Sequence, residues 1–329
     1  MRHPLFQKCL LLLSIGMLLM IPLRMIQSVI DERTMFRHQA TQAIAAATAG
    51  TQSIAGPLLI FPVDEYFDDI SIERHGGQTT KRVVRSVIRH QVVVTPKQLH
   101  FDGDMKVERR AYGLYDTSVF SLRETISGNF ETPDASALPK PGANARLVWG
   151  SPVLVLGVGD PRGIDGEPKV SLAGRPLQLR HGTRLAESDM RLPDSLPDAK
   201  EARAAVASQA DETSPARAFN IRSGFKAVGA EKHDGRPATL PFTITLNLSG
   251  TSGLKLIPLG ETTTAELRSD WPHPSFGGNY LPRSREVGEH GFSARWSTTA
   301  LATDNVNQEN DGFQVTLIDP VDIYQQATR

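Results

Sequence analysis

The sequence predicts a mainly β protein that one N-terminal helix holds to a membrane. Three observations lead to this class. A single long apolar run occupies residues 9–23, an alanine-rich segment follows it, and short β-branched runs bounded by Gly, Pro, Asn or Asp recur from residue 57 onward. We therefore expect a transmembrane helix that extends into a stalk, followed by a β-rich region outside the membrane.

The apolar run has a competing interpretation as a cleaved secretory signal. Its fifteen residues, 9–23, cover about 22 Å as a helix, which is less than the ~30 Å of a bilayer core. A signal peptide needs small residues just after the run, but residues 24–30 contain no A-x-A-like pair, and the first such match lies at residues 47–49. Apolar residues continue past Arg24 to Ile30, so we interpret the segment as an uncleaved anchor.

The charges beside the run predict its orientation. Arg2 and Lys8 lie on its N-terminal side, and positive flanks remain in the cytoplasm. We expect a cytoplasmic N-terminus in the inner membrane, bilayer contact through residues 5–30, and a periplasmic location for the chain after about residue 30.

Composition excludes several partners and chemistries. Cys9 is the only cysteine and no lipobox-like sequence precedes it, so we expect neither a disulfide nor a lipid anchor. Of the 36 Lys and Arg residues, Arg2, Lys8 and Arg24 belong to the anchor, which leaves 33 against 36 Asp and Glu. This balance provides no basic surface for nucleic acid.

The elements after the anchor follow from local patterns. Residues 27–49 carry apolar residues at three- and four-residue steps and predict a helical stalk that Gly50 ends. Residues 197–210, P-D-A-K-E-A-R-A-A-V-A-S-Q-A, predict one short surface helix. Strands are predicted in the segments L-L-I-F-P-V, R-S-V-I-R-H-Q-V-V-V-T-P, L-V-W-G-S-P-V-L-V-L-G-V-G, P-F-T-I-T-L-N-L-S-G and G-F-Q-V-T-L-I-D-P.

One internal similarity suggests two stacked β modules. Phe120–Gly128 reads F-S-L-R-E-T-I-S-G and Phe242–Gly250 reads F-T-I-T-L-N-L-S-G. Nine-residue alternating strands also resemble one another without a duplication, so both explanations remain open. The expected organisation is an anchor and stalk (1–50), a first module (51–160), an insertion with a short helix (161–215) and a second module (216–329).

Motifs for metal or nucleophilic catalysis are missing. None of the nine histidines has the spacing of a zinc motif. His90 and His100 would lie close together if their strands were neighbours. Pro152 after Gly150-Ser151 prevents a nucleophile elbow. Asp160, Asp165 and Glu167 surround a glycine turn that resembles a calcium loop, but Arg162 lies inside it, which favours a solvated turn.

Acidic pairs leave one enzymatic alternative open. A periplasmic hydrolase of envelope glycans needs two carboxylates whose separation the sequence does not give. The candidate groups are Asp64, Glu65, Asp68 and Asp69 in one cluster and Asp102 and Asp104 in another. Nothing in the sequence favours this alternative, and we expect a protein without catalytic residues, metal or cofactor.

The most distinctive loop is S-D-W-P-H-P-S-F-G-G-N-Y-L-P-R-S-R-E-V, residues 269–287. Two prolines fix the backbone around His273 and remove two N–H donors, so we expect an ordered loop rather than a strand. A ligand-binding loop and a corner packed on the domain are both possible, and the packed corner is favoured. The residues assigned to this structural or interaction loop are Trp271, Pro272, His273, Pro274, Phe276, Tyr280 and Arg285.

Five segments together resemble the CreD family of bacterial inner-membrane proteins. They are S-D-W-P-H-P-S-F-G-G-N-Y-L-P, G-F-S-A-R-W-S, L-I-D-P-V-D-I-Y-Q, L-L-M-I-P-L-R-M-I-Q-S-V-I-D-E-R and G-P-L-L-I-F-P-V. The resemblance implies a role in cell envelope integrity through an unidentified envelope partner, linked to two-component regulation and colicin tolerance, without enzymatic activity. Family members continue into further membrane helices, so we expect this chain, which stops at Arg329, to be a truncated form or fragment.

Overall fold

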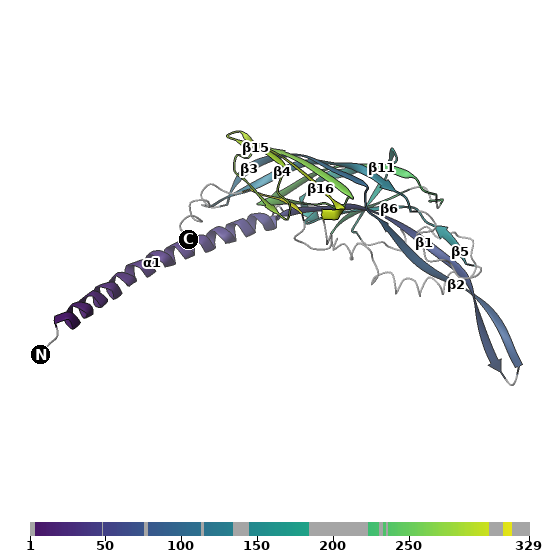
Figure 1. Ribbon diagram of the computed structural model, residues 1–329, viewed down its shortest axis with the longest axis horizontal. Coiled ribbons are helices and arrows are strands. Elements are labelled where there is room, and N and C mark those ends of the chain that lie inside the picture. The colour runs from purple at the N-terminus through teal and green to yellow at the C-terminus, as the bar shows by residue number, and fades with distance from the viewer. Residues whose placement is uncertain are drawn as a thin grey trace.

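In the part of the chain that it describes, the structure, a computed structural model, has one long helix and two β-sheets (Figure 1). It describes residues 4–47, 49–75, 78–112, 115–133, 145–183, 223–229, 233–234, 236–302 and 312–317. The predicted helix at residues 197–210 and most of the insertion 161–215 lie outside the described residues. The mainly β class with an N-terminal apolar helix is confirmed.

Helix α1 (Pro4–Ala47) is continuous over 44 residues and leads away from the sheets, with the N-terminus at its far end (Figure 1). Its segment Leu11–Arg33 has a mean hydropathy of 1.8 and no residue buried inside the protein. These 23 residues cover about 35 Å, which is enough for a bilayer core. The helix then continues to Ala47, as the stalk prediction requires.

The first sheet has nine strands in the described part of the chain. Its central strand, β1, pairs with β6, β2 and β5 in antiparallel and with β12 in parallel orientation. The path runs β14 (Pro274–Gly278), β17 (Phe313–Leu317), β12 (Gly253–Ile257), β1 (Gln52–His75), β6 (Val153–Val158), β10 (Gly224–Val228) and β9 (Gln178–His181), and β2 (Gln78–Val94) and β5 (Arg146–Trp149) join at β1.

The second sheet has eight strands among the described residues. All neighbours are antiparallel except β13 and β3, which are parallel. The order is β15 (Ser284–Gly288), β16 (Gly291–Thr299), β13 (Thr262–Ser269), β3 (Gln98–Tyr112), β4 (Tyr115–Glu131), β11 (Thr239–Thr251), β7 (Ile164–Leu172) and β8 (Arg175–Pro176). The described residues also include two short 3₁₀ turns, η2 (Pro161–Gly163) and η4 (Ala300–Ala302).

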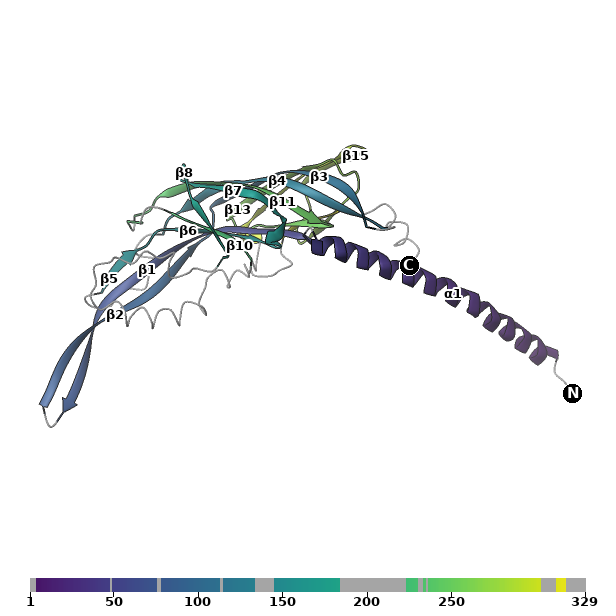
Figure 2. The ribbon, with the colours of Figure 1, turned by 180° about the vertical axis from the view of Figure 1, so that it is seen from behind.

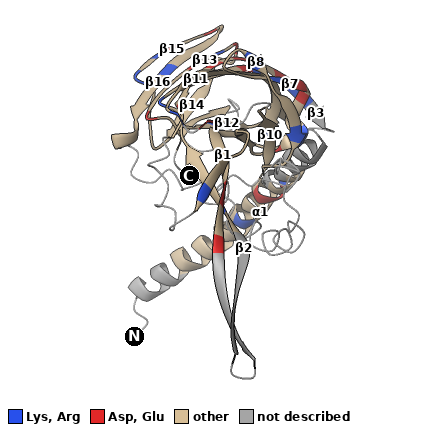
Figure 3. Ribbon diagram, turned by 90° about the vertical axis from the view of Figure 1, so that its right-hand side faces the viewer, with Lys and Arg blue, Asp and Glu red and all other residues tan. Residues whose placement is uncertain are grey.

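The two sheets pack face to face around the larger of two apolar clusters, and charged residues lie on the outer side of the eight-stranded sheet (Figure 3). The alternation of apolar and polar residues along the strands produces this arrangement, because every second side chain of a strand points to the same face. In β11 the burial pattern alternates along the strand, with Phe242, Ile244, Leu246 and Leu248 buried. The largest buried side chains include Phe61 from the first sheet and Trp296 from the second.

The two similar segments of the sequence lie side by side. Phe120–Gly128 in β4 pairs with Phe242–Gly250 in β11, in antiparallel register, with Gly128 opposite Phe242 and Gly250 opposite Phe120. The sequence ranges 51–160 and 216–329 each contribute strands to both sheets. The halves of the chain are therefore interleaved, and the division of the sequence into two modules stays a prediction.

One expectation about local structure was wrong. Residues 274–278 form strand β14, which pairs with β17 from Pro274 opposite Leu317 to Gly278 opposite Phe313. The prolines had suggested a loop because proline donates no N–H to a ladder. β14 is the edge strand of its sheet, where one side of the strand needs no ladder donors, so proline is tolerated.

Strands β1 and β2 form a hairpin that projects beyond both sheets (Figures 1 and 2). The pairing runs without interruption from Leu59 opposite Val94 to His75 opposite Gln78. Strand β5 pairs with the hairpin as far as Tyr66, so in the described part of the chain the outer hairpin is a two-stranded ribbon. Isolated two-stranded ribbons are marginally stable in water.

A carboxyl group is buried in the core. Glu124 follows the inward alternation of β4 between Leu122 and Ile126 and is completely buried. Neither of its carboxylate oxygens has a hydrogen-bond partner within the described part of the chain. Burial, reinforced by the negative charge of Asp102, raises the pKa of the Glu124 carboxyl well above its ordinary value. The folded protein therefore holds this proton more tightly than the unfolded chain does.

Replacing Glu124→Gln is expected to remove a pH dependence of stability. Because the folded-state pKa is raised, the stabilisation is complete below pH 4.5 and is lost as the pH rises toward the folded pKa. At pH 8 we expect the free energy of unfolding of the variant to be higher than that of the original protein, by on the order of 1 kcal/mol. Near pH 4.5 we expect the two values to be equal. Guanidinium unfolding in detergent micelles measures both values.

The exposed Glu167→Gln on β7 is the matched control and should leave the pH profile unchanged. A profile that is equally steep with and without Glu124 would contradict the assignment.

Candidate functional site at the helix–sandwich joint

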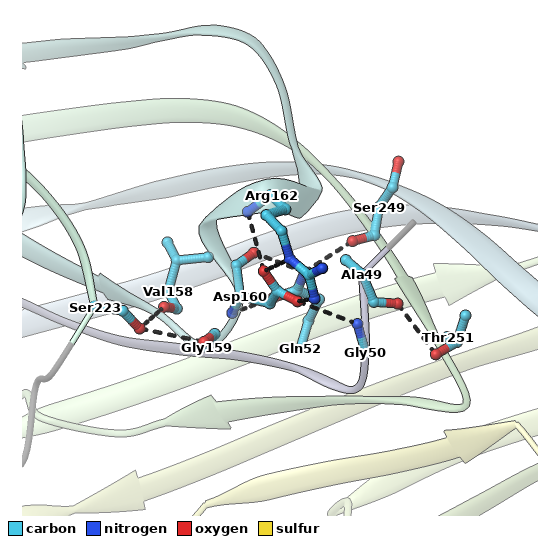
Figure 4. Close-up of polar contacts among 10 residues, drawn as sticks. All are labelled: Ala49, Gly50, Gln52, Val158, Gly159, Asp160, Arg162, Ser223, Ser249 and Thr251. Carbon is cyan, nitrogen blue, oxygen red and sulfur yellow. Dashed lines mark hydrogen bonds and ion pairs between the residues drawn. The ribbon is translucent and has the colours of Figure 1, made fainter. Parts of the chain in front are cut away.

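A few residues separate the end of α1 from the start of β1, where both sheets lie close to the chain. Ala49 and Gly50 lead directly into β1, whose first residue, Gln52, is fully buried. Gln52 opens the central strand of the nine-stranded sheet and lies next to β11 of the eight-stranded sheet. We call the contacts of residues 49–52 with β11 and with the turn after β6 the joint (Figure 4).

The amide of Gln52 connects three separate segments. Its Nε2 donates to the carbonyl oxygens of Asp160, at 3.0 Å, and Ser249, at 2.9 Å. Its Oε1 accepts from the backbone N–H of Asp160 at 3.1 Å. One side chain thus pairs with three part-buried backbone groups of the turn and of β11.

Asp160 holds the other side of the joint. Its carboxylate caps η2 by accepting from the Arg162 N–H at 3.1 Å and also accepts from the Arg162 guanidinium, with Nη2 at 2.6 Å. A longer contact of 3.4 Å reaches the N–H of Gly50. Hydrogen bonding by Arg162 lowers the pKa of the Asp160 carboxyl below its ordinary value. The carboxylate therefore stays charged at neutral pH and keeps the turn closed.

This ion pair also explains the sequence that resembled a calcium loop. Arg162 occupies the Asp160 carboxylate, and Asp165 and Glu167 are exposed on β7. In the described residues, no group of three or more His, Cys, Asp and Glu is placed to hold a metal ion.

Backbone contacts close the joint on both sides. Thr251 of β11 donates its N–H to Gly50 O at 3.1 Å and its hydroxyl to Ala49 O at 3.2 Å. Glycines allow this approach, because a Cβ on Gly163 would collide with Gln52 Nε2 and with Ser249 O. The chain just after the helix, at Ala49 and Gly50, is therefore bonded to β11 and to the turn after β6.

The distinctive loop lies at a second junction, where the chain passes from one sheet to the other. β14 belongs to the nine-stranded sheet and β15 to the eight-stranded sheet. Trp271 is buried just before β14, and its Nε1 donates to His273 O at 3.0 Å. The Arg109 guanidinium lies over the Trp271 ring, 5.7 Å from its centroid. His273 itself is exposed.

Aromatic rings fill the space behind this loop. Phe276 makes edge contacts with Phe292 and Trp296, with ring centroids 5.5 and 5.8 Å apart. Trp296 stacks on Phe313 at 5.8 Å, and Tyr280 meets the same Phe313 ring at 5.9 Å. The rings come from both sheets. The loop residues thus close the core at this end.

The remaining assigned loop residues lie at the surface of this corner. Pro272 and Pro274 are half-buried, whereas Arg285 on β15 is exposed and places its guanidinium 5.7 Å from the Phe276 ring centroid. Trp271 thus occupies the packed position that we expected of the corner, and the His273 side chain does not. The role of the loop in binding a partner stays a prediction.

Four of the six carboxylates considered as catalytic candidates contact basic side chains. On the hairpin, Asp64 binds Arg89 at 2.7 Å and Glu65 binds the His90 ring at 2.8 Å. On the outer face of the eight-stranded sheet, Arg268 bridges Asp102 and Asp104, at 2.6 and 2.8 Å.

The two histidines considered as a convergent pair lie in different sheets. His90 is on β2 of the nine-stranded sheet, whereas His100 on β3 of the eight-stranded sheet contacts Thr264 Oγ1 at 2.8 Å. Each ring therefore contacts residues of its own sheet.

Sequence reasoning missed the joint. Gln52 stands between Gly50 and a strand of apolar residues, and this position of a single amide before a buried run was the available signal. Its partners are 108 and 197 residues away along the chain, so no local pattern identified them.

Substitutions in the distinctive loop should separate the packed tryptophan from the exposed histidine. We expect Trp271→Ala to lower the free energy of unfolding by about 3–5 kcal/mol, because it opens a cavity behind β14. His273→Ala should change it by no more than about 0.5 kcal/mol, since the ring is exposed. Guanidinium unfolding followed by circular dichroism measures both, and equal effects would refute the packing described here.

Comparison with known proteins identifies the family. Residues 4–329 match the family model described as "Inner membrane protein CreD". The chain is 30% identical, over 343 aligned positions, to the inner membrane protein CreD of Escherichia coli strain K12, and the alignment covers 100% of this chain and 65% of that relative. The chain therefore spans a little under two thirds of the length of the relative. Since the match includes the helix, the joint and both sheets, the chain belongs to the CreD family of inner membrane proteins.

Proposed function

We propose that this chain contributes to cell envelope integrity from the periplasmic side of the inner membrane, by interaction rather than by catalysis. α1 anchors it with the N-terminus in the cytoplasm, in keeping with the positive charges of Arg2 and Lys8. The sandwich then lies outside and meets an envelope protein. Membership of an inner-membrane protein family and the apolar segment Leu11–Arg33 support this placement.

The contacts at the joint are the main support for the proposal. A domain that only needed to stay near the membrane would function on a flexible tether. Here Gln52, Asp160 and Thr251 hold the residues just after the helix and the start of β1 against β11 and the turn after β6, and small residues allow close packing around them. A fixed connection is useful when the direction of the domain relative to the membrane matters, as it does for contact with a partner in the envelope.

The projecting hairpin is the part of the domain that we expect to make such a contact. Beyond Tyr66 its two strands pair, among the described residues, only with each other, and they leave the sandwich (Figure 2). A marginally stable ribbon gains order when a partner covers it. The hydrolase alternative receives no comparable support, because Asp64, Glu65, Asp102 and Asp104 are all paired with basic side chains.

Loosening the joint should impair the protein without releasing it from the membrane. We expect an insertion of six Gly-Ser residues after Gly50, expressed in cells that lack the gene for this chain, to restore envelope integrity less well than the original sequence. Leakage of a periplasmic enzyme under mild detergent stress measures integrity. An insertion of the same length in the exposed turn after Ala173 is the matched control.

Two measurements accompany this test. Both variants must reach the membrane fraction at equal levels, and a cysteine placed at Glu167, with Cys9 replaced by Ser, should react with a membrane-impermeant maleimide from the periplasmic side. Failure of that labelling would reverse the proposed orientation, and full restoration by the loosened joint would contradict the role of a fixed domain.

A further inference from the structure

A cavity of about 230 Å³ adjoins the joint on the outer face of the eight-stranded sheet. Two of its lining residues, Gly163 and Ser249, also contact Gln52. In Figure 4 the Ser249 carbonyl points to Gln52 and its side chain points away. The cavity is lined by Glu108, Arg110, Val119, Ser121, Arg162, Gly163, Ile164, Asp165 and Ser249.

Charged side chains of both signs surround this space. Glu108 and Arg110 are two positions apart on β3, so both point to the outer face, and Asp165 approaches from β7. Within the part of the chain that the structure describes, no hydrogen bond or ion pair engages any of these three side chains. Arg162 differs from them, because its guanidinium is held by Asp160.

The charges around the cavity indicate which kind of ligand fits it. A guanidinium matches a carboxylate with two parallel hydrogen bonds, and two carboxylates suit an ammonium group, which carries three donors. The volume is below the ~300–1,000 Å³ that is typical of sites for drug-sized molecules. The space therefore suits a molecule with one ammonium and one carboxylate and the size of an amino acid or dipeptide.

We propose that this cavity binds a small zwitterion, an amino acid or dipeptide, whose carboxylate meets Arg110 and whose ammonium meets Glu108 and Asp165. Ser121 and Ser249 provide neutral polar groups between the charged ends. The bound molecule would lie against the outer wall of the joint. This inference concerns binding alone and does not depend on the proposed role in envelope integrity.

Glycylglycine is a suitable probe, measured by isothermal titration calorimetry on the full chain in detergent micelles. We expect a Kd on the order of 1 mM or tighter, as is usual for so small a ligand in a preformed site. Blocking either end of the probe, as in N-acetylglycylglycine or glycylglycine amide, should weaken binding at least about tenfold, since each loses one of the two charge contacts.

Variants of the lining residues complete the test. Arg110→Ala and Asp165→Asn should each weaken glycylglycine binding about tenfold or more, and Glu108→Gln serves if either variant unfolds earlier than the original protein. Lys169→Ala, on β7 outside the cavity, is the matched control and should bind as the original does. No binding at tens of millimolar, equal binding of the blocked probes, or unchanged affinity in all three cavity variants would each overturn the proposal.

Discussion

The structure depends on the buried amide of Gln52. It is the first residue of the central strand of one sheet, and its side chain pairs with backbone groups of β11 in the other sheet and of the turn after β6. Removing Gln52 would take away the hydrogen-bond partner of all three backbone groups. The same few residues therefore connect the two sheets close to the point where the chain leaves the helix.

This constraint connects the architecture with the family. The interleaved strand order gives each sheet segments from distant parts of the chain, and β1 runs from the joint through the core into the projecting hairpin. The joint and the projecting hairpin are thus the two ends of one strand. Such a connection suits an inner membrane protein whose sandwich must be presented in one orientation.

Much of the fold could be predicted from the sequence, because its signals are local. The apolar run, the continuing helix and the alternating strands each have a period that a short window reveals. The strand at Pro274 was missed because tolerance of proline depends on an edge position, which only the assembled sheet defines. The joint was missed for a related reason: Gln52 forms its contacts with residues far away in the sequence. The loop around His273 was predicted as a packed corner from its two prolines. Trp271 is buried there, but His273 is exposed, because its exposure depends on the neighbouring strands.

The rigidity of the joint is the central claim, and a distance distribution measures it most directly. Nitroxide labels at Arg33 on α1 and Glu167 on β7, in a chain with Cys9 replaced by Ser and reconstituted in lipid nanodiscs, allow pulsed electron resonance to record the distribution between helix and sandwich. A single narrow distribution that broadens in Gln52→Ala, but not in the exposed control Gln98→Ala, is the predicted result. A distribution that is already broad in the original chain would contradict the account.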